Sequence, residues 1–306
     1  MKNSEVHYEF QIEIETQCFL NCIHCSSVNL RHVREIQYSP SSISPFLSIF
    51  RGRKTVVFTG GEPLANFGLP EIASVLKESV ENVSFGIFSS GITFDNGKLI
   101  SVSASEARRL KNSGIRFAYL SFYHQSPEYH DLITGVPTSF NLTHKTLQSF
   151  LTEDIDVKVH LVLNRFNIDD LDKIINHFFS LGILEVRLLR LARHGNAEIY
   201  WDKIGIPNKK VNSAVIDILE RFEKGPGIVS ISGFPQVMPC RPWAGARGCQ
   251  AGSRLMFVTH EGEVFPCACV RNRKDLEIGS LSDLSKIREY IENNSFEYRD
   301  KCLNAI

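Results

Sequence analysis

Three cysteines near the start of the chain, Cys18, Cys22 and Cys25, have the spacing Cys-x3-Cys-x2-Cys. They directly follow an alternating run, residues 8–15, that predicts a β-strand. Thiolates this close suit one metal centre, and soft sulfur ligands select iron–sulfur clusters or zinc. Three ligands on a four-iron cluster leave one iron with open coordination positions, as a reactive centre requires. In a zinc site, His24 would be available as the fourth ligand.

A second motif, Gly60-Gly61-Glu62-Pro63, follows the predicted strand 54–59. The ordered pair of motifs, each at the end of a strand, resembles the radical S-adenosylmethionine (SAM) superfamily. The resemblance implies that the three cysteines hold a [4Fe–4S] cluster whose fourth iron binds the amino and carboxylate groups of SAM. It also implies that one electron cleaves SAM to a 5′-deoxyadenosyl radical, which abstracts a substrate hydrogen.

The same resemblance implies which residues contact SAM. Gly60 and Gly61 are expected to let the backbone approach the methionine amino group, and Glu62 to accept a hydrogen bond from that ammonium. His24 is expected to stack on the adenine ring. The other expected contacts lie at strand ends and in the second motif: Pro63, Ser89, Ser121 and Arg190, with Ser90 and Arg187 as alternatives. His124 is a candidate substrate contact, whereas helix capping alone could explain Asp131.

Five further cysteines lie together near the C-terminal end: Cys240, Cys249, Cys267, Cys269 and Cys302. The order Cys249-x-x-Gly252, a hairpin at 255–266 turning at 261–262, and Pro266-Cys267 resembles the SPASM or shortened twitch extension. The resemblance implies one auxiliary [4Fe–4S] cluster, with Cys240, Cys249, Cys267 and Cys302 as expected ligands. A zinc ribbon with four cysteine ligands is the alternative for this module.

Cys269 is left over from that ligand set. A thiol near a radical site can donate a hydrogen atom, so Cys269 is the expected catalytic donor. Two alternatives stay open for this residue: a fourth cluster ligand in place of Cys240, or an inert buried thiol.

Strands and helices alternate over most of the chain. Strands are predicted at 8–15, 54–59, 83–89, 115–122, 156–163 and 184–190, and helices at 41–51, 66–80, 103–113, 139–152 and 168–181. This alternation predicts an α/β fold with a parallel sheet. With the family resemblance it implies a partial (β/α)6 TIM-like barrel over residues 1–200, with its site at the carboxyl ends of the strands. Residues 201–306 are expected to form a small twitch/SPASM-like extension, with helices at 208–223 and 281–293 and a hairpin at 255–266.

The composition restricts partners and compartment. Formal net charge is zero and no basic stretch is present, so no nucleic-acid partner is expected. No apolar run approaches the roughly 18 residues of a membrane span, and residues 1–7 lack the apolar core of a signal peptide. A cytoplasmic location is therefore expected, where eight cysteines favour metal ligation over disulfides.

Three hypotheses for function follow from the motifs. The first is a radical SAM maturase of a peptide or small natural product, with epimerisation through Cys269 favoured, and an external electron donor such as flavodoxin or ferredoxin. The second is oxidation or cross-linking with the auxiliary cluster as electron acceptor, or modification of a sugar or aminoglycoside. The third, from another class, is a non-catalytic metal or redox sensor. No peptide-binding winged helix is expected before the first strand.

Overall fold

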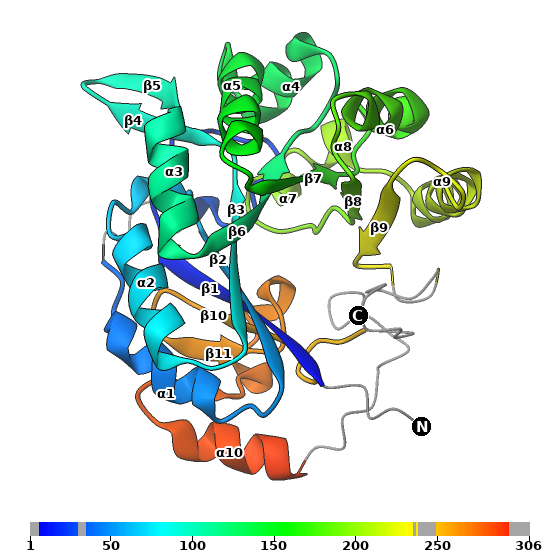
Figure 1. The fold of residues 1–306 in the computed structure, drawn as a ribbon. Coiled ribbons are helices and arrows are strands. Elements are labelled where there is room, and N and C mark those ends of the chain that lie inside the picture. The colour runs from blue at the N-terminus through cyan, green and yellow to red at the C-terminus, as the bar shows by residue number, and fades with distance from the viewer. Residues whose placement is uncertain (1–5, 30–34, 235–236, 238–248, 294–306) are drawn as a thin grey trace.

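The computed structural model of the chain describes residues 6–29, 35–234, 237 and 249–293 (Figure 1). Its centre is a ten-stranded sheet with the order β12-β11-β10-β1-β2-β3-β6-β7-β8-β9. The six predicted strands are confirmed within one residue at each end: β1 (His7–Glu15), β2 (Arg53–Gly60), β3 (Val83–Ser89), β6 (Ile115–Ser121), β7 (Asp156–Val162) and β8 (Glu185–Leu189). All six pair in parallel, as βαβ connections require.

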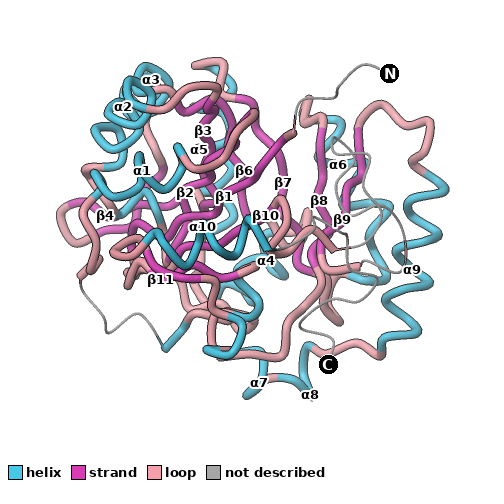
Figure 2. Tube along the Cα trace, turned by 90° about the horizontal axis from the view of Figure 1, so that it is seen from below, coloured by secondary structure: helices cyan, strands magenta, loops and turns pink. Residues whose placement is uncertain are grey.

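Helices cover the outer face of this curved sheet (Figure 1). The five predicted ones are present as α1 (Ile43–Ser48), α2 (Leu69–Ser79), α3 (Ala104–Ser113), α5 (Ser139–Thr152) and α6 (Leu171–Ser180). Figure 2 shows α1, α2 and α3 on one side of the strands and α6 and α9 (Asn208–Arg221) on the other. Outward side chains such as Phe10 and Ile12 are fully buried beneath the helices. The result is the predicted α/β partial barrel, and in the described part no helix is long and apolar enough to cross a membrane.

The hairpin formed by β4 (Ile92–Asp95) and β5 (Lys98–Ser101) was not predicted. Its turn, Asn96-Gly97, has positive φ at both residues, 46° and 81°. An Asn-Gly pair between short apolar runs is a strong local hairpin signal, so the sequence did carry this information. Strand β9 (Ile228–Ser232) was also missed, because five residues with two serines are too short for a clear periodic pattern.

The predicted C-terminal hairpin is confirmed as β10 (Leu255–Val258) and β11 (Glu263–Phe265), and β12 (Gly279–Ser280) pairs with β11. Strand β10 pairs in parallel with β1, so this hairpin continues the barrel sheet. The boundary at residue 200 stays a prediction, but sheet hydrogen bonding crosses it. Helix α10 (Leu284–Asn293) begins three residues after its predicted start.

Candidate active site

The cysteine loop follows β1 at its carboxyl end and is held from two sides. The backbone N–H groups of Asn21 and Ile23 donate to carbonyls at the end of α4 (Pro127–Thr134), at 2.9 Å each. Asn196, the first residue of α7 (Asn196–Ile199), donates from Nδ2 to the Cys22 carbonyl and from its backbone N to the Cys25 carbonyl, both at 2.9 Å. These bonds fix the backbone of the loop from segments far apart in the sequence.

The three thiols share one apolar pocket with Tyr123, which follows β6. Cys22 is buried and packs with Tyr123, while Cys18 and Cys25 are partly buried against the same cluster. Burial raises the pKa of Tyr123 well above its usual value, and the charges of Cys22, Cys25 and Cys18 raise it further. All three thiols therefore lie near the same phenol. Three thiolates are soft ligands, and this donor set fits a metal centre such as an iron–sulfur cluster. In the side-chain positions of this structure, no group of three His, Cys, Asp or Glu among the described residues is placed to hold a metal ion.

Tyr123 was not predicted as a site residue. It also contacts His24, with ring centroids 4.5 Å apart in an edge-to-face arrangement. Nothing in the sequence around Tyr123 indicates this role, because the contact depends on how the cysteine loop folds back over β6.

His24 is held as a neutral imidazole. Burial lowers its pKa to about 4, and its buried Nδ1 has no hydrogen-bond partner. Because the imidazole is uncharged near neutral pH, it suits contact with an uncharged ring. Stacking of His24 on adenine stays a prediction.

Gly60 and Gly61 pack against the chain that leads into the cysteine loop. A Cβ atom at Gly60 would lie 1.9 Å from the Glu15 carbonyl oxygen, and one at Gly61 would lie 2.2 Å from that of Gln17. The N–H of Gly61 donates to Glu15 O at 2.8 Å, and the N–H of Glu62 donates to Gln17 O at 2.7 Å. Close contact with β1 therefore explains both glycines, and it ties the second motif to the residues just before Cys18.

Glu62 is buried and its carboxylate accepts four hydrogen bonds from the protein itself. Oε1 accepts from Ser89 Oγ at 2.6 Å and Leu64 N at 3.1 Å, while Oε2 accepts from Ser90 N at 2.7 Å and Ser90 Oγ at 2.5 Å. Burial raises its pKa, and these hydrogen bonds offset part of that effect. These donors fill about as many positions as the lone-pair sites of a carboxylate. Direct contact of Glu62 and Ser89 with SAM stays a prediction. The four hydrogen bonds make Glu62 the group that joins the Pro63 turn to the end of β3.

Replacing Glu62 with glutamine is expected to lower the free energy of unfolding by about 2 kcal/mol, because the amide cannot accept from both serines and leaves a buried donor unpaired. Urea denaturation, monitored by circular dichroism, measures this change in the free energy of unfolding. Glu71→Gln, an exposed glutamate on α2, is the matched control and should change stability little. Equal stability of the two variants would contradict a structural role for the Glu62 carboxylate.

The remaining predicted SAM contacts lie at different places around the barrel. Ser121 ends β6 and is partly exposed. It is hydrogen-bonded to Tyr123, which lies against the cysteine loop. Arg187 is buried, and its guanidinium forms an ion pair with Glu185 at 3.0 Å inside the barrel. Arg190 donates to Asn208 Oδ1 at 2.6 Å, toward the start of α9. Arg190 also lies over the Phe234 ring at 5.4 Å, and its role at SAM stays a prediction.

The polar stretch after β6 is engaged in local contacts. His124 accepts from Ser126 N at 2.9 Å through Nδ1, and its Nε2 lies 3.7 Å from Asp170 Oδ2. Asp131 accepts from the backbone of Thr138 and Phe140 at the start of α5. The capping explanation of Asp131 is confirmed, on the helix that follows rather than on its own.

The second cysteine site lies at the base of the β10–β11 hairpin. Gly252 N donates to the carbonyls of Leu255 and Pro266, which brings the segments around Cys249 and Cys267 together. Both cysteines pack against Ala251 and Val270. Cys240 and Cys302, the other two expected ligands, lie outside the described residues.

Cys269 lies beside Cys267 on a short 3-10 helix, η6 (Ala268–Val270), and is exposed. The hydrogen bond and charge of Cys269, together with burial, raise the pKa of Cys267. Cys269 is therefore close enough to Cys267 to bind the same cluster, and exposed enough to meet a substrate. Both roles stay open.

A buried ion pair connects this second site to β1. Arg271, two residues after Cys269, donates through both terminal nitrogens to the carboxylate of Glu13, with one bond at 2.6 Å. Burial alone would raise the pKa of Glu13, but hydrogen bonding from His260 and the charge of Arg271 outweigh it and lower the pKa. Since β10 begins beside Glu9, the second site starts near the end of β1 opposite Cys18.

Comparison with protein families agrees with this arrangement. Residues 12–178, more than half of the chain, match the model of the Radical SAM superfamily. The match contains the cysteine loop, the Gly60–Pro63 motif and strands β2 to β7. The protein belongs to the radical SAM superfamily and is an enzyme that uses a [4Fe–4S] cluster and SAM.

Curated relatives and solved structures are similar over most of the chain. PqqA peptide cyclase of Rhizobium meliloti (strain 1021) is 24% identical, covering 93% of this chain and 73% of that protein. AdoMet-dependent heme synthase of Methanosarcina barkeri is 21% identical, and the match covers 83% of this chain and 75% of that protein. Among solved structures, native anSMEcpe with bound AdoMet has a TM-score of 0.69 at 17% identity, and the match covers 94% of this chain and 81% of that one. Streptococcus suis SuiB bound to S-adenosylmethionine has a TM-score of 0.70 at 14% identity, and the match covers 94% of this chain and 66% of that one. At these identities the structures support the fold.

Proposed function

We propose that the protein is a maturase that modifies a peptide at an unactivated C–H carbon. The observation that carries the proposal is the contact between the two motifs. The Gly60–Pro63 segment is hydrogen-bonded to the residues just before Cys18, and a second pair of cysteines, Cys249 and Cys267, flanks the hairpin whose strand β10 pairs with β1. Similar proteins support a peptide substrate, since one is a PqqA peptide cyclase and another, SuiB, is known bound to the precursor peptide SuiA.

When bound, the cluster and SAM supply the 5′-deoxyadenosyl radical. The protein's own residues position these groups: Cys18, Cys22 and Cys25 would hold the cluster, and Glu62 fixes the ends of β2 and β3 beside it. Cys249 and Cys267, with Cys240 and Cys302, would hold the auxiliary cluster. An external donor such as flavodoxin or ferredoxin would supply the electron. The exposed thiol of Cys269 favours a reducing compartment, which we propose is the cytoplasm.

Within this function we favour epimerisation with Cys269 as donor. Once a hydrogen atom has been removed from the substrate carbon, the Cys269 S–H bond would break to give its hydrogen atom to the opposite face of that carbon. The electron donor and a proton then restore the thiol. The second candidate is oxidation or cross-linking with Cys269 as a cluster ligand, which its contact with Cys267 favours.

Cys269→Ala is expected to abolish epimer formation while 5′-deoxyadenosine is still produced, because hydrogen abstraction does not need the thiol. Chiral amino-acid analysis of the product and counting of protein-bound iron measure the two roles separately. Loss of about four iron atoms, the content of one [4Fe–4S] cluster, would instead assign Cys269 as a ligand and support the second candidate.

Two other outcomes would move the function elsewhere. Turnover of a sugar or aminoglycoside, but of no peptide, would replace the substrate class. Absence of reductive SAM cleavage by fully reconstituted protein would leave the sensor hypothesis.

A further inference from the structure

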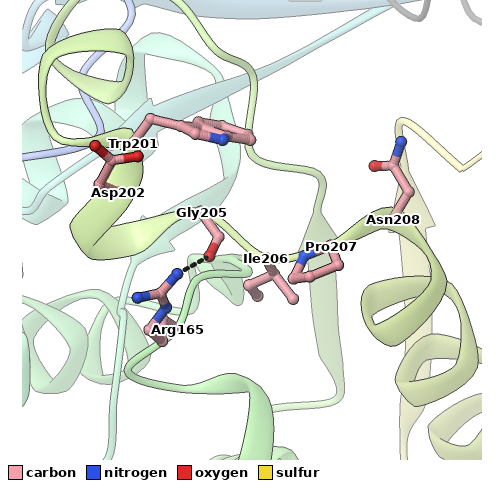
Figure 3. A pocket seen from close by; sticks show the side chains of 7 residues that line it. All are labelled: Arg165, Trp201, Asp202, Gly205, Ile206, Pro207 and Asn208. Atoms are coloured by element: carbon pink, nitrogen blue, oxygen red, sulfur yellow. Dashed lines mark hydrogen bonds between the residues drawn. The ribbon is translucent and has the colours of Figure 1, made fainter.

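A cavity of about 390 Å³ opens at the carboxyl end of the barrel, on the side of β7 and β8 (Figure 3). Its wall comes from three segments: the loop after β7 with Arg165, α8 (Trp201–Ile204), and the start of α9 with Asn208. Among the described residues, none of those predicted to bind SAM or a cluster lines it.

The cavity is built from fixed contacts. Arg165 donates from its backbone N to Ile204 O at 3.0 Å and from Nη2 to Gly205 O at 3.1 Å. A Cβ atom at Gly205 would lie 2.7 Å from Trp201 O and 2.9 Å from the indole nitrogen, so only glycine fits there. The backbone on both sides of the opening is therefore held in place before any ligand arrives.

The same segment holds the cysteine loop. Asn196, which binds the carbonyls of Cys22 and Cys25, lies five residues before Trp201 in the same stretch between β8 and α9. A ligand in the cavity would consequently be anchored on the elements that position the cysteine loop.

One guanidinium group lines the opening, and two more contact residues of its wall. Arg165 lines it, Arg193 lies over the Trp201 ring at 5.3 Å, and Arg190 binds Asn208. Guanidinium groups favour carboxylates and phosphates through paired hydrogen bonds. Asp202 is also in the wall, and its negative charge disfavours a doubly charged phosphate. The Asp202 carboxylate and the Asn208 side chain suit a ligand that carries N–H donors together with a carboxylate.

We infer that this cavity binds an acidic side chain of the peptide substrate, with Arg165 as its principal contact. The inference rests on the proposed peptide maturase function and names a subsite for it. The bound segment would lie outside the barrel interior, so it would anchor the substrate rather than react.

The test is isothermal titration calorimetry of reconstituted protein with two probes, N-acetyl-tetraglutamyl amide and the tetraglutaminyl amide of the same length. The glutamate probe is expected to bind about tenfold more tightly, the worth of one charge-assisted hydrogen bond. Arg165→Gln and, separately, Arg193→Gln should remove that preference. Arg116→Gln, an exposed arginine at the start of β6 at the other end of the barrel, should retain it.

Equal binding of both probes, or an unchanged preference in both arginine variants, would overturn the inference. Competition by inorganic phosphate at lower concentration than the glutamate probe would also overturn it, in favour of a phosphate site. Formation of 5′-deoxyadenosine is measured in parallel. Its presence without probe binding defeats only this inference, whereas its absence defeats the proposed function.

Discussion

Cys22→Ser protein is expected to lose reductive cleavage of SAM, with 5′-deoxyadenosine falling to the background of protein-free reactions. Serine preserves the size of the side chain but replaces a soft thiolate with a hard hydroxyl, which is a poor ligand for iron–sulfur clusters. Cys22 is the buried member of the triplet, so no solvent-exposed neighbour can take its place. The assay is chromatography of 5′-deoxyadenosine from anaerobic reactions with dithionite.

The fold of this variant should persist, because the loop is held by backbone hydrogen bonds to α4 and Asn196 and not by the thiol alone. Ser26→Ala, an exposed position next to Cys25, is the matched control and should cleave SAM at the unaltered rate. Wild-type amounts of 5′-deoxyadenosine from Cys22→Ser would exclude the triplet as the cluster site.

Arg271→Met is expected to lower the free energy of unfolding by about 3–5 kcal/mol, since it leaves the Glu13 carboxylate buried without its partner. The double variant Glu13→Gln with Arg271→Met should recover part of this loss, because no charge is then left unpaired. Guanidinium chloride denaturation measures all three proteins. The lowered pKa of Glu13 means that the contribution of the pair is present above the ordinary glutamate pKa and is lost as pH falls through the folded-state pKa.

The matched control for this pair is Arg273→Met, which removes an exposed arginine paired with Asp275 two residues further on. An exposed pair is worth at most about 1 kcal/mol, so this variant should be nearly as stable as the wild type. Similar losses from Arg271→Met and Arg273→Met would show that the Glu13 contact does not hold the Cys267–Cys269 segment to β1.

The sequence predicted the barrel strands well because each has an alternating or continuous apolar pattern next to a helix-forming segment, and this pattern depends on local periodicity alone. It predicted the first cysteine loop and the hairpin between Cys249 and Cys267 for a related reason, because both depend on residue type and spacing. The ligands of the auxiliary cluster stay a prediction. The β4–β5 hairpin was overlooked although its Asn96-Gly97 turn is a local signal.

Long-range contacts were beyond reach of the sequence. The contact of Tyr123 with the cysteine loop and the pair between Glu13 and Arg271, which are 258 positions apart, depend on the completed barrel. Glu62 shows a second limit. Its place in the motif indicated a direct contact with SAM, which stays a prediction, but did not indicate its four hydrogen bonds to Leu64, Ser89 and Ser90.

The most direct test of the central claim is magnetic resonance of the reduced, anaerobically reconstituted protein with SAM labelled at the methionine nitrogen with ¹⁵N. Three cysteine ligands leave one iron available, so hyperfine coupling between the cluster and the labelled nitrogen is expected, and Cys22→Ser should lose it. Absence of coupling in protein with a full complement of iron, or zinc in place of iron at this site, would contradict it.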